Sequence, residues 1–299
     1  MAAVNNSGLR GEMRLDEPMA LHTTWKVGGP ARRFYRPADS QDLLLFLGGL
    51  SEDEPLLWLG LGSNLLVRDG GFAGTVIATQ GRLEGLALVA PARLRIESGV
   101  ACAKVARFAA REGLCGAEFL AGIPGTMGGA LAMNAGAFGG ETWEHVVEVE
   151  TVDRHGVVRH RRPEEFEIGY RHVKGAEGEW FLAALLELTP GDVAAGQQEI
   201  RSLLERRAAT QPTGLPSCGS VFRNPEGDHA ARLIEAAGLK GTVIGGACVS
   251  EKHANFIINT GDARASDIEQ LIELVRAQVE EMSGIRLRTE VHIVGEVAA

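Results

Sequence analysis

The sequence predicts an α+β fold built from two or three domains. Its 299 residues exceed the usual size of one domain and are enough to bury a sizeable core. Short apolar runs typical of strands alternate with amphipathic helical stretches along the whole chain. Glycine is unusually frequent, with 39 residues that gather at 60–74 and again at 113–140. These two glycine-rich stretches are the first candidates for a functional site.

The first third of the chain predicts a small α/β unit. Extended segments flank the Gly-Gly-Pro turn at 28–30, and Asp39 or Ser40 caps the helix that follows. A short apolar strand is expected at 55–60, and glycine turns separate two strand-like runs within 60–79.

The middle third predicts a sheet with one packed helix and a long polar helix. The expected elements are paired strands at 86–100, a helix at 101–112 ended by Gly113, a hairpin at 145–161 turning at His155–Gly156, a strand at 179–188 and a helix at 192–209. The proline-rich segment 210–216 then marks a domain boundary.

The last third predicts a helix at about 228–237, strands at 243–249 and 255–259, and a clear helix at 267–283. Ser266 and Glu269 suggest a capping box for the clear helix. Its apolar stripe comprises Ile268, Leu271, Ile272, Val275, Val279 and Met282. In the closing strand at 285–294, one face carries Leu287, Thr289, Val291 and Ile293, and the other carries Arg286, Arg288, Glu290 and His292.

Composition and charge exclude several classes of function. A formal net charge of −9 argues against broad binding of nucleic acid or anionic membranes, which requires basic surfaces. No run of 18 apolar residues predicts a membrane span, and the first residues lack the apolar core of a signal peptide, so we expect a cytoplasmic protein. The four cysteines are scattered and the histidines show no metal-binding spacing, so we expect buried thiols and no metal site.

Neither glycine-rich stretch is a common phosphate fingerprint. The absence of G-x-G-x-x-G and GxxxxGK[ST] disfavours a classical dinucleotide fold and a P-loop. The stretch GIPGTMGGALAMNAGAFGG at 122–140 still suits a diphosphate, because its seven glycines let backbone N–H groups approach anionic oxygens. GSNLLV at 62–67 adds a hydroxyl and an amide. Tight structural turns are the alternative, although two such loops in one chain favour a large anionic cofactor.

The segment CGSVFRNP at 218–225 contains a serine with no obvious chemical partner. Ser220 lies in G-S-V, not in the G-x-S-x-G pattern of a hydrolase nucleophile. No histidine, lysine or acid lies close to it in the sequence to remove its proton. The residues alone leave two possibilities open, a turn residue that caps the backbone and a hydroxyl with a different chemical role.

Taken together and in order, eight segments resemble the UDP-N-acetylenolpyruvoylglucosamine reductase family over about residues 20–295. These segments are TTWKVGGPA, GLGSNLLV, GIPGTMGGALAMNAGAFGGE, IGYR, CGSVFRNP, AGLKG, VSEKHANFIIN and LRTEVHIVG. The glycine loops are shared with other flavoproteins of the same fold. IGYR, GSVFRNP and TEVHIVG in that order are far more specific.

The resemblance implies an α+β, two-subdomain FAD-binding fold of the vanillyl-alcohol-oxidase/PCMH type and a C-terminal α/β substrate-binding domain. The expected domains are 1–80 with 290–299, then 81–210, and finally 211–289 for the substrate. FAD would bind noncovalently. Its expected contacts are Gly60, Gly62, Ser63, Asn64, Leu65, Gly122, Ile123, Pro124, Gly125, Gly128, Gly129, Asn134 and Gly136.

The resemblance also implies a reaction. NADPH would reduce the flavin, and a hydride would pass from flavin N5 to the β-carbon of UDP-N-acetylglucosamine enolpyruvate, giving UDP-N-acetylmuramate for peptidoglycan synthesis. Ser220 would then act as a general acid and protonate the α-carbon. Arg171 in IGYR would hold the substrate carboxylate. Glu290 would either donate a hydrogen bond while protonated or position the serine.

Further substrate contacts are expected at Tyr170, Arg223, Asn224, Lys240, His253 and Asn255. Bland alternatives exist for several candidates. Arg171 and Glu290 could form an ordinary ion pair. Lys240 could lie at a helix C-terminus, where the helix dipole favours a positive charge.

The chain departs from the family pattern in two places. Longer members carry a tyrosine on an extra loop that closes over the substrate, whereas here only 48 residues separate Arg171 from Ser220 and no such loop fits. Val173 also stands where serine is expected. We expect a monomer. The competing functions are a flavin oxidase of the same fold and a non-catalytic nucleotide-binding protein.

Overall fold

The structure is a computed structural model that describes residues 8–298. The chain divides into two compact units. Unit 1 comprises 8–14, Arg33–Gly60 and Gly74–Arg206, and unit 2 comprises Leu15–Arg32, Leu61–Ala73 and 207–298.

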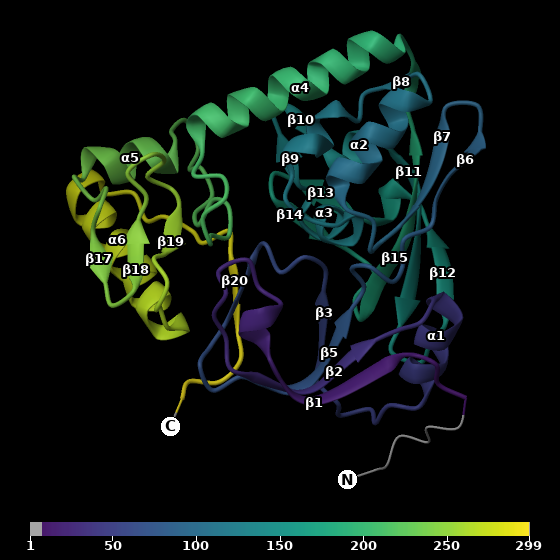
Figure 1. Ribbon diagram of the computed structural model, residues 1–299, viewed down its shortest axis with the longest axis horizontal. Helices are drawn as coiled ribbons and strands as arrows, with labels where there is room; N and C mark the ends of the chain where they lie inside the picture. Colours follow the sequence, from purple (N-terminus) through teal and green to yellow (C-terminus); the bar gives the residue numbers. More distant parts are fainter. Residues whose placement is uncertain (1–7, 299) are drawn as a thin grey trace. The chain divides into compact units, whose positions relative to one another are not determined.

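The helices and strands follow one another in a mixed order (Figure 1). The α-helices are α1 (Ser40–Gly48), α2 (Cys102–Arg111), α3 (Met127–Met133), α4 (Val193–Thr210), α5 (Ala230–Ala236) and α6 (Ala265–Ser283). Short 3-10 helices are η1 (Met19–Leu21), η2 (Glu118–Gly122), η3 (Thr142–His145) and η4 (Pro163–Glu165). The strands of the first half are β1 (Glu12–Pro18), β2 (Pro30–Arg36), β3 (Leu56–Leu59), β4 (Leu65–Val67), β5 (Phe72–Ala78), β6 (Leu86–Ala90), β7 (Arg93–Glu97), β8 (Leu114–Cys115), β9 (Gly136–Ala137) and β10 (Gly140–Glu141). Those of the second half are β11 (Val146–Asp153), β12 (Val158–Arg161), β13 (Glu167–Gly169), β14 (His172–Lys174), β15 (Glu179–Glu187), β16 (Thr189–Pro190), β17 (Val243–Ile244), β18 (Ala247–Val249), β19 (Ile257–Asn259) and β20 (His292–Val294).

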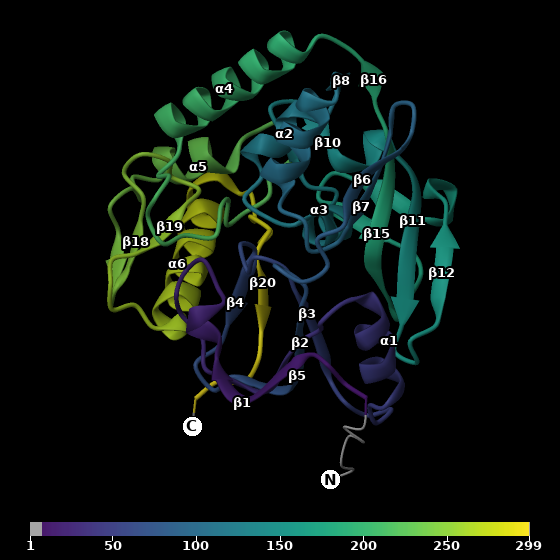
Figure 2. The same ribbon diagram turned by 45° about the vertical axis from the view of Figure 1, so that its right-hand side comes forward.

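Unit 1 is organised around a five-stranded antiparallel sheet in the order β12-β11-β15-β7-β6. Helices α2 and α3 lie against one face of this sheet, as Figure 2 shows. Their buried side chains, including Val105, Ala109 and Leu131, share one apolar core with Ile96 and Ala184 of the strands. Burial of this common core, and not intrinsic propensity, holds the short helix α3 in place.

A bulge in β15 lets the sheet contribute to two cores. Ala183 lies opposite Glu150 while Phe181 lies opposite Thr151, so Leu182 is an extra residue without a partner. A bulged residue shifts the alternation of side chains by one. Leu182 therefore packs in a second core of unit 1, with Leu43 and Phe46 of α1.

Helix α1 begins where the sequence predicts, because the Asp39 side chain accepts the backbone N–H of Asp42 at 2.9 Å. Asp42 is itself fully buried and accepts the Tyr35 hydroxyl at 2.5 Å. The Tyr35 ring also stacks on Phe46, with ring centroids 3.7 Å apart.

Unit 2 packs α5 and α6 against the antiparallel sheet β17-β18-β19, and it contains the parallel pair of β4 and β20. Its core holds Trp25, whose indole N–H donates to the Ile257 carbonyl at 2.7 Å. The Asn259 amide returns a bond to the Trp25 carbonyl at 2.8 Å. These buried bonds tie the TTWKVGG segment to residues more than 200 positions away in the sequence.

The start of α6 differs from the prediction. Ser266 and Glu269 do not form a capping box. The Asp69 carboxylate instead accepts the backbone N–H groups of Ala265 at 2.9 Å and Ser266 at 3.0 Å. Glu269 is engaged by Arg68 at 2.8 Å. The N-cap position is held by Arg264, whose backbone N–H donates to the Asp267 carboxylate at 2.9 Å. The predicted capping box is therefore wrong, because the helix starts earlier, Asp69 accepts the Ser266 N–H and Arg68 binds Glu269.

Most of the predicted elements are confirmed, with local corrections. The predicted strand 243–249 is a tight hairpin, because Gly245 at φ +53° and Gly246 turn the chain between β17 and β18. The predicted closing strand 285–294 is shorter in the structure, where only β20 (His292–Val294) is a strand. Five members of the α6 stripe are buried, but Met282 near its end is 64% exposed. The sequence analysis did not predict β1 or the β13–β14 hairpin.

No helix within residues 8–298 combines the length and the apolar character needed to cross a membrane.

Candidate cofactor and catalytic site

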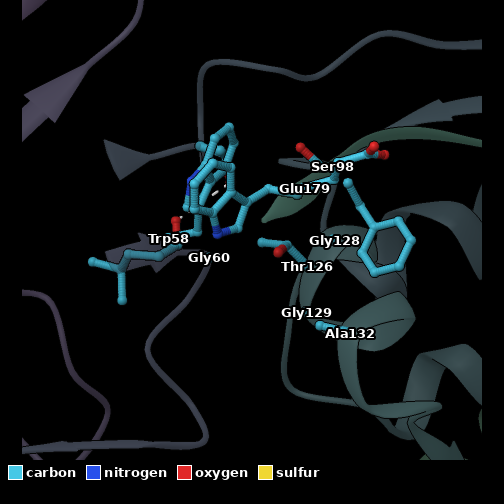
Figure 3. A pocket seen from close by; sticks show the side chains of 12 residues that line it. Trp58, Gly60, Ser98, Thr126, Gly128, Gly129, Ala132 and Glu179 are labelled. Carbon is cyan, nitrogen blue, oxygen red and sulfur yellow. Dashed lines mark hydrogen bonds between the residues drawn. The ribbon is translucent and has the colours of Figure 1, made fainter. Parts of the chain in front are cut away.

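Unit 1 contains a cavity of about 160 Å³ where its glycine-rich loop meets the sheet. Figure 3 shows the Trp58 indole, Ser98 and Thr126 around this cavity. The complete lining is Trp58, Leu59, Gly60, Thr79, Ser98, Thr126, Gly128, Gly129, Ala132, Glu179, Trp180 and Phe181. Three expected cofactor residues, Gly60, Gly128 and Gly129, are among them.

Three polar atoms in the lining are buried and have no hydrogen-bond partner within the described part of the chain. They are Trp58 Nε1, Ser98 Oγ and Thr126 Oγ1. Thr126 is informative because it is the N-cap residue of α3, where a threonine oxygen normally accepts a backbone N–H of the helix. Here the hydroxyl makes no such bond. Buried polar groups are rarely left unpaired, so this cavity is suited to a polar ligand.

The glycines allow the segments that form the cavity wall to pack closely against one another. A Cβ atom on Gly60 would lie 2.3 Å from Thr126 Oγ1, and one on Gly128 would lie 2.8 Å from Ser98 Cβ. The backbone N–H groups of Met127 and Gly128 donate to the carbonyls of Val100 and Ser98, both at 2.8 Å. These two backbone N–H groups are therefore already paired within the protein, and the Ser98 and Thr126 hydroxyls are side-chain donors at the same wall.

The next expected cofactor residues form the turn before α3. Gly122 is buried, and a Cβ atom there would lie 2.4 Å from the Phe138 ring. Ile123 packs on the unit 1 core, Pro124 is exposed, and the Gly125 carbonyl accepts the Cys102 N–H at 2.9 Å. This turn is consequently fastened to the start of α2.

Asn134 ends α3 in the left-handed conformation at φ +45° and connects it to a hairpin. Its amide nitrogen donates to Glu141 at 2.8 Å and to the Gly169 carbonyl at 3.2 Å, while its oxygen accepts the Trp143 N–H at 3.1 Å. An asparagine suits this position because it tolerates a positive φ and uses both ends of its amide.

Arg171 lies in the β13–β14 turn, also at a positive φ of +53°. Its guanidinium donates to the carbonyls of Gly136 at 2.7 Å and Asn134 at 3.3 Å, and it lies 5.2 Å from the centroid of the Tyr170 ring. Tyr170 is 47% exposed. The structure thus brings Arg171 and Tyr170 to the end of the glycine-rich loop, as one group within unit 1.

In unit 2 the GSV segment and the segment around Glu290 run side by side. Phe222 and Thr289 form an antiparallel bridge, and the Glu290 N–H donates to the Val221 carbonyl at 2.8 Å. The Ser220 hydroxyl forms no hydrogen bond with any residue in 8–298. Ser220 is partly exposed, as is Glu290.

The buried side chain of Asn255 supports the GSV segment. Its amide nitrogen donates to the Phe222 carbonyl at 2.8 Å, and its oxygen accepts the Phe222 N–H at 2.9 Å. The Asn255 carbonyl also accepts the Val221 N–H at 2.9 Å. Asn255 was expected to contact the substrate, and in this structure its amide instead pairs with the backbone beside Ser220.

The GSNL loop joins the same group in unit 2. Asn64 donates from its amide to the Glu290 carbonyl at 3.1 Å, and its own carbonyl accepts the His292 N–H at 3.1 Å. The Cys218 thiol donates to the Ser63 carbonyl at 2.8 Å, and burial raises the pKa of that thiol. Leu65 then pairs with His292 in the β4–β20 ladder.

Gly62 sits at the turn that opens this loop, at φ +69°. A Cβ atom there would lie 2.1 Å from the His22 carbonyl oxygen, so the close approach requires glycine. Its carbonyl accepts the Thr24 N–H at 3.1 Å. The TTWKVGG segment thereby supports the GSNL loop.

The other expected substrate residues also lie in unit 2. Arg223 Nε is buried and makes no hydrogen bond to the described residues, whereas the Asn224 oxygen accepts the Ala230 N–H at 3.1 Å. Lys240 pairs with Glu235 at 3.2 Å. The His253 ring lies 4.8 Å from the Phe256 ring, and burial lowers its pKa.

Seven polar or aromatic residues of the unit 1 cavity were not predicted from the sequence: Trp58, Thr79, Ser98, Thr126, Glu179, Trp180 and Phe181. The two indoles stack at 5.3 Å between centroids. Thr126 could have been found, since it is the hydroxyl inside GIPGTMGG, within 122–140. Ser98 and the indoles could not, because Ser98 follows β7 and the indoles lie in β3 and β15, which no local motif connects.

The residues of this cavity fit a bound FAD. The unpaired hydroxyls and the indole N–H can donate to acceptor atoms such as phosphate or ring nitrogens. The volume of about 160 Å³ matches part of a dinucleotide, and the remaining expected contacts lie in the loops described above. The chain thus has a suitable set of donors for this cofactor.

Comparisons with known proteins assign two segments of the chain to described domains. The profile described as an FAD binding domain matches residues 31–161. The profile described as the C-terminal domain of UDP-N-acetylenolpyruvoylglucosamine reductase matches residues 211–294.

Similar full-length proteins carry the same description. The UDP-N-acetylenolpyruvoylglucosamine reductase of Alkalilimnicola ehrlichii is 64% identical over 286 residues, which is 96% of each chain. That of Methylococcus capsulatus is 63% identical, over 97% of this chain and 95% of its own. A crystal structure of the reductase from Thermus caldophilus is 32% identical and superposes with a TM-score of 0.79, covering 95% of this chain and 99% of that one. The chain therefore belongs to the UDP-N-acetylenolpyruvoylglucosamine reductase family, whose members are FAD-dependent oxidoreductases of peptidoglycan synthesis.

Proposed function

We propose that this chain uses NADPH to reduce UDP-N-acetylglucosamine enolpyruvate to UDP-N-acetylmuramate, with Ser220 as the proton donor. One observation carries the assignment of Ser220. Its hydroxyl forms no hydrogen bond to the described residues, so none of their side chains is placed to remove its proton. A serine that attacks needs such a base, whereas a serine that gives a proton does not.

Bound FAD, once reduced by NADPH, would supply the hydride that the β-carbon of the enolpyruvyl group receives. Gly60, Ser98 and Thr126 are proposed to hold it in unit 1, and Ser63 and Asn64 in unit 2. Ser98 and Thr126 would donate hydrogen bonds, and the glycine would allow close approach.

Ser220 would complete the reduction. Addition of a hydride to the β-carbon leaves a pair of electrons on the α-carbon, delocalised into the adjacent carboxylate. A proton from Ser220 Oγ forms the new C–H bond, and the serine alkoxide recovers its proton from solvent. The hydride and the proton together saturate the double bond. The two hydrogen bonds from the Asn255 amide to the Phe222 backbone support this role, because they fix the backbone segment that carries the Ser220 hydroxyl.

The charge that develops on the substrate needs fixed donors. Arg171 is proposed to bind the carboxylate with its planar guanidinium, and the Gly136 and Asn134 carbonyls already orient that group. Arg223, whose buried Nε has no hydrogen-bond partner among residues 8–298, is proposed as a second donor to the substrate.

Glu290 is proposed to act beside Ser220. Its backbone is held by Asn64 and by Val221, which places the residue on the segment next to the GSV segment. In one role its protonated carboxyl donates a hydrogen bond to the developing negative charge, and in the other the carboxylate orients the Ser220 hydroxyl.

The remaining expected contacts are proposed to bind the parts of the substrate that do not react. Tyr170, Asn224, Lys240 and His253 are proposed to meet the uridine diphosphate or sugar part, with Asn255 as a positioning residue for Phe222. A domain arrangement of 1–80 with 290–299, 81–210 and 211–289, a monomeric state and a cytoplasmic location also remain predictions.

The test replaces Ser220 with alanine and follows the two half-reactions separately by rapid mixing. Reduction of the flavin by NADPH should keep its rate. Reoxidation of the reduced flavin by the enolpyruvyl substrate should slow by about 10²–10⁴, the usual contribution of a general acid.

The matched control is Ser217→Ala, which removes a hydroxyl three positions away in the same loop. It should leave both rates unchanged. Equal losses in both half-reactions of Ser220→Ala, or no loss in either, would contradict a proton-donor role.

A further inference from the structure

A second and larger cavity lies between α2 and α4 in unit 1. It has a volume of about 660 Å³, and both ribbon views show α4 running over α2 (Figure 1, Figure 2). Its lining is Ala101, Ala103, Lys104, Arg107, Arg111, Gln197, Ile200, Arg201 and Leu204. It shares no lining residue with the cavity at Thr126, and no role in the proposed reduction involves it.

The charge of this cavity is opposite to that of the whole protein. The chain has a net charge of −9, yet the lining carries four cationic side chains and no acid. Lys104, Arg107 and Arg111 are spaced three and four residues apart on α2, so they lie along one face of the helix. Arg201 on α4 completes the cationic lining.

Three of these cations lack an acidic partner within residues 8–298. Arg107 donates only to the Ala103 carbonyl at 3.0 Å, Arg201 donates only to the neutral Gln198 at 2.7 Å, and Arg111 lies over Phe108. Lys104 has a distant carboxylate in Glu84 at 3.7 Å. Most arginines on the rest of this acidic surface form ion pairs, for example Arg93 with Glu187 at 2.8 Å. An anion would therefore find guanidinium groups here that no described carboxylate neutralises.

The size and the apolar part of the lining indicate what kind of anion fits. Ile200 of α4 is buried and lies with Leu204 and two alanines in the same lining. A volume of about 660 Å³ falls in the range of pockets that bind drug-sized ligands and is too large for an inorganic anion alone. We propose that the α2–α4 cavity binds a nucleoside diphosphate, with the phosphates on the arginines and the nucleoside on Ile200 and Leu204.

Backbone contacts connect this cavity with the glycine-rich loop. Ala101 forms a β-bridge with Thr126, and the N–H of Cys102, the first residue of α2, donates to the Gly125 carbonyl at 2.9 Å. A nucleotide that orders the start of α2 would thus act on the loop that carries Thr126.

The test measures binding of ADP to the FAD-loaded, oxidised protein by isothermal titration calorimetry at low ionic strength. Wild type should bind one ADP. The double variant Arg107→Gln, Arg111→Gln should lose about tenfold in affinity per arginine, or about 100-fold in all, because each removes a charge-assisted hydrogen bond. Raising the salt concentration should weaken binding to wild type.

The matched control is Arg93→Gln, Arg232→Gln, which removes the same charge from exposed arginines outside the cavity. It should bind ADP as wild type does. Pyrophosphate should bind at least tenfold more weakly than ADP if the apolar lining contributes.

Three results would overturn the proposal: no ADP binding by wild type at millimolar concentration, binding that survives in the cavity variant, or an equal loss in the control variant. Thermal unfolding of all variants excludes a folding defect as the cause. Because no turnover is measured, failure here leaves the reductase proposal intact, and failure of the Ser220 test leaves this one intact.

Discussion

At the scale of single residues, Thr126 departs from the usual N-cap hydrogen bond at a residue that is proposed to contact FAD. Its backbone caps α3, but its buried hydroxyl has no hydrogen-bond partner in the described part of the chain. A buried hydroxyl without a hydrogen-bond partner lowers the stability of the FAD-free protein. A bound ligand that pairs with the hydroxyl offsets this cost. Removing this hydroxyl should therefore weaken the binding of FAD without lowering the stability of the FAD-free protein.

The Thr126→Val variant removes the hydroxyl at nearly constant volume. We expect the dissociation constant of FAD to rise about tenfold, the cost of one hydrogen bond to a charged group. The free energy of unfolding of the protein without FAD should stay the same or increase. Fluorescence titration with FAD and urea unfolding measure the two quantities.

The control for Thr126→Val is Thr213→Val, which makes the same chemical change at an exposed position. It should alter neither quantity. If Thr126→Val lowered the stability of the cofactor-free protein and left FAD affinity unchanged, Thr126 would have a purely structural role.

The site residues named from the sequence all lie within motifs, and the sequence missed both Thr126, which lies inside such a motif, and residues that lie outside any motif. Arg171, Ser220 and Glu290 came from the family resemblance, and the structure places each on a loop or segment held by backbone hydrogen bonds. Ser98 and Trp58 escaped prediction because their neighbours in space are far away in the sequence.

At the scale of elements, helical periodicity and turn residues predicted α1, α2, α4 and the β6–β7 and β11–β12 hairpins close to their observed bounds. Such signals are local. The start of α6 could not be predicted in the same way, because its cap is Asp69, almost 200 positions earlier. The bulge at Leu182 likewise depends on pairing with another strand.

Replacing Asp69 with alanine tests this long-range cap. The free energy of unfolding should fall by about 1 kcal/mol, within the 0.5–2 kcal/mol typical of a lost N-cap. Urea unfolding measures the change, and Asp53→Ala in an exposed loop is the control that should have no effect.

The cap should also depend on pH. Burial by itself raises the pKa of Asp69, but the N–H groups of Ser266 and Ala265 outweigh burial and hold it below the ordinary 3.8. A carboxyl whose pKa is lowered by folding stabilises the protein above its ordinary pKa and loses that contribution as the pH falls through its folded-state pKa. The stability difference between wild type and Asp69→Ala should shrink below about pH 4. A difference that stays constant down to pH 2 would exclude the carboxylate as the cap.

At the scale of the whole molecule, the expected functional residues fall into two groups that the sequence could not separate. Unit 1 carries Gly60, the 122–136 loop and Arg171, and unit 2 carries the GSNL loop, Ser220 and Glu290. The predicted domains are 1–80 with 290–299, then 81–210 and 211–289, and this arrangement stays a prediction. The two compact units are each assembled from several pieces of chain. Such interleaving depends on strands that pair across long separations, which local patterns do not encode.

The measurement that tests the proposed function most directly is the visible absorption spectrum of the purified protein under anaerobic conditions. NADPH is added first, and UDP-N-acetylglucosamine enolpyruvate follows. We predict a yellow protein that bleaches with NADPH and recovers its colour only when the enolpyruvyl substrate is added. A yellow protein that bleaches but ignores this substrate, or a colourless protein that FAD cannot reconstitute, would contradict the proposed reductase activity.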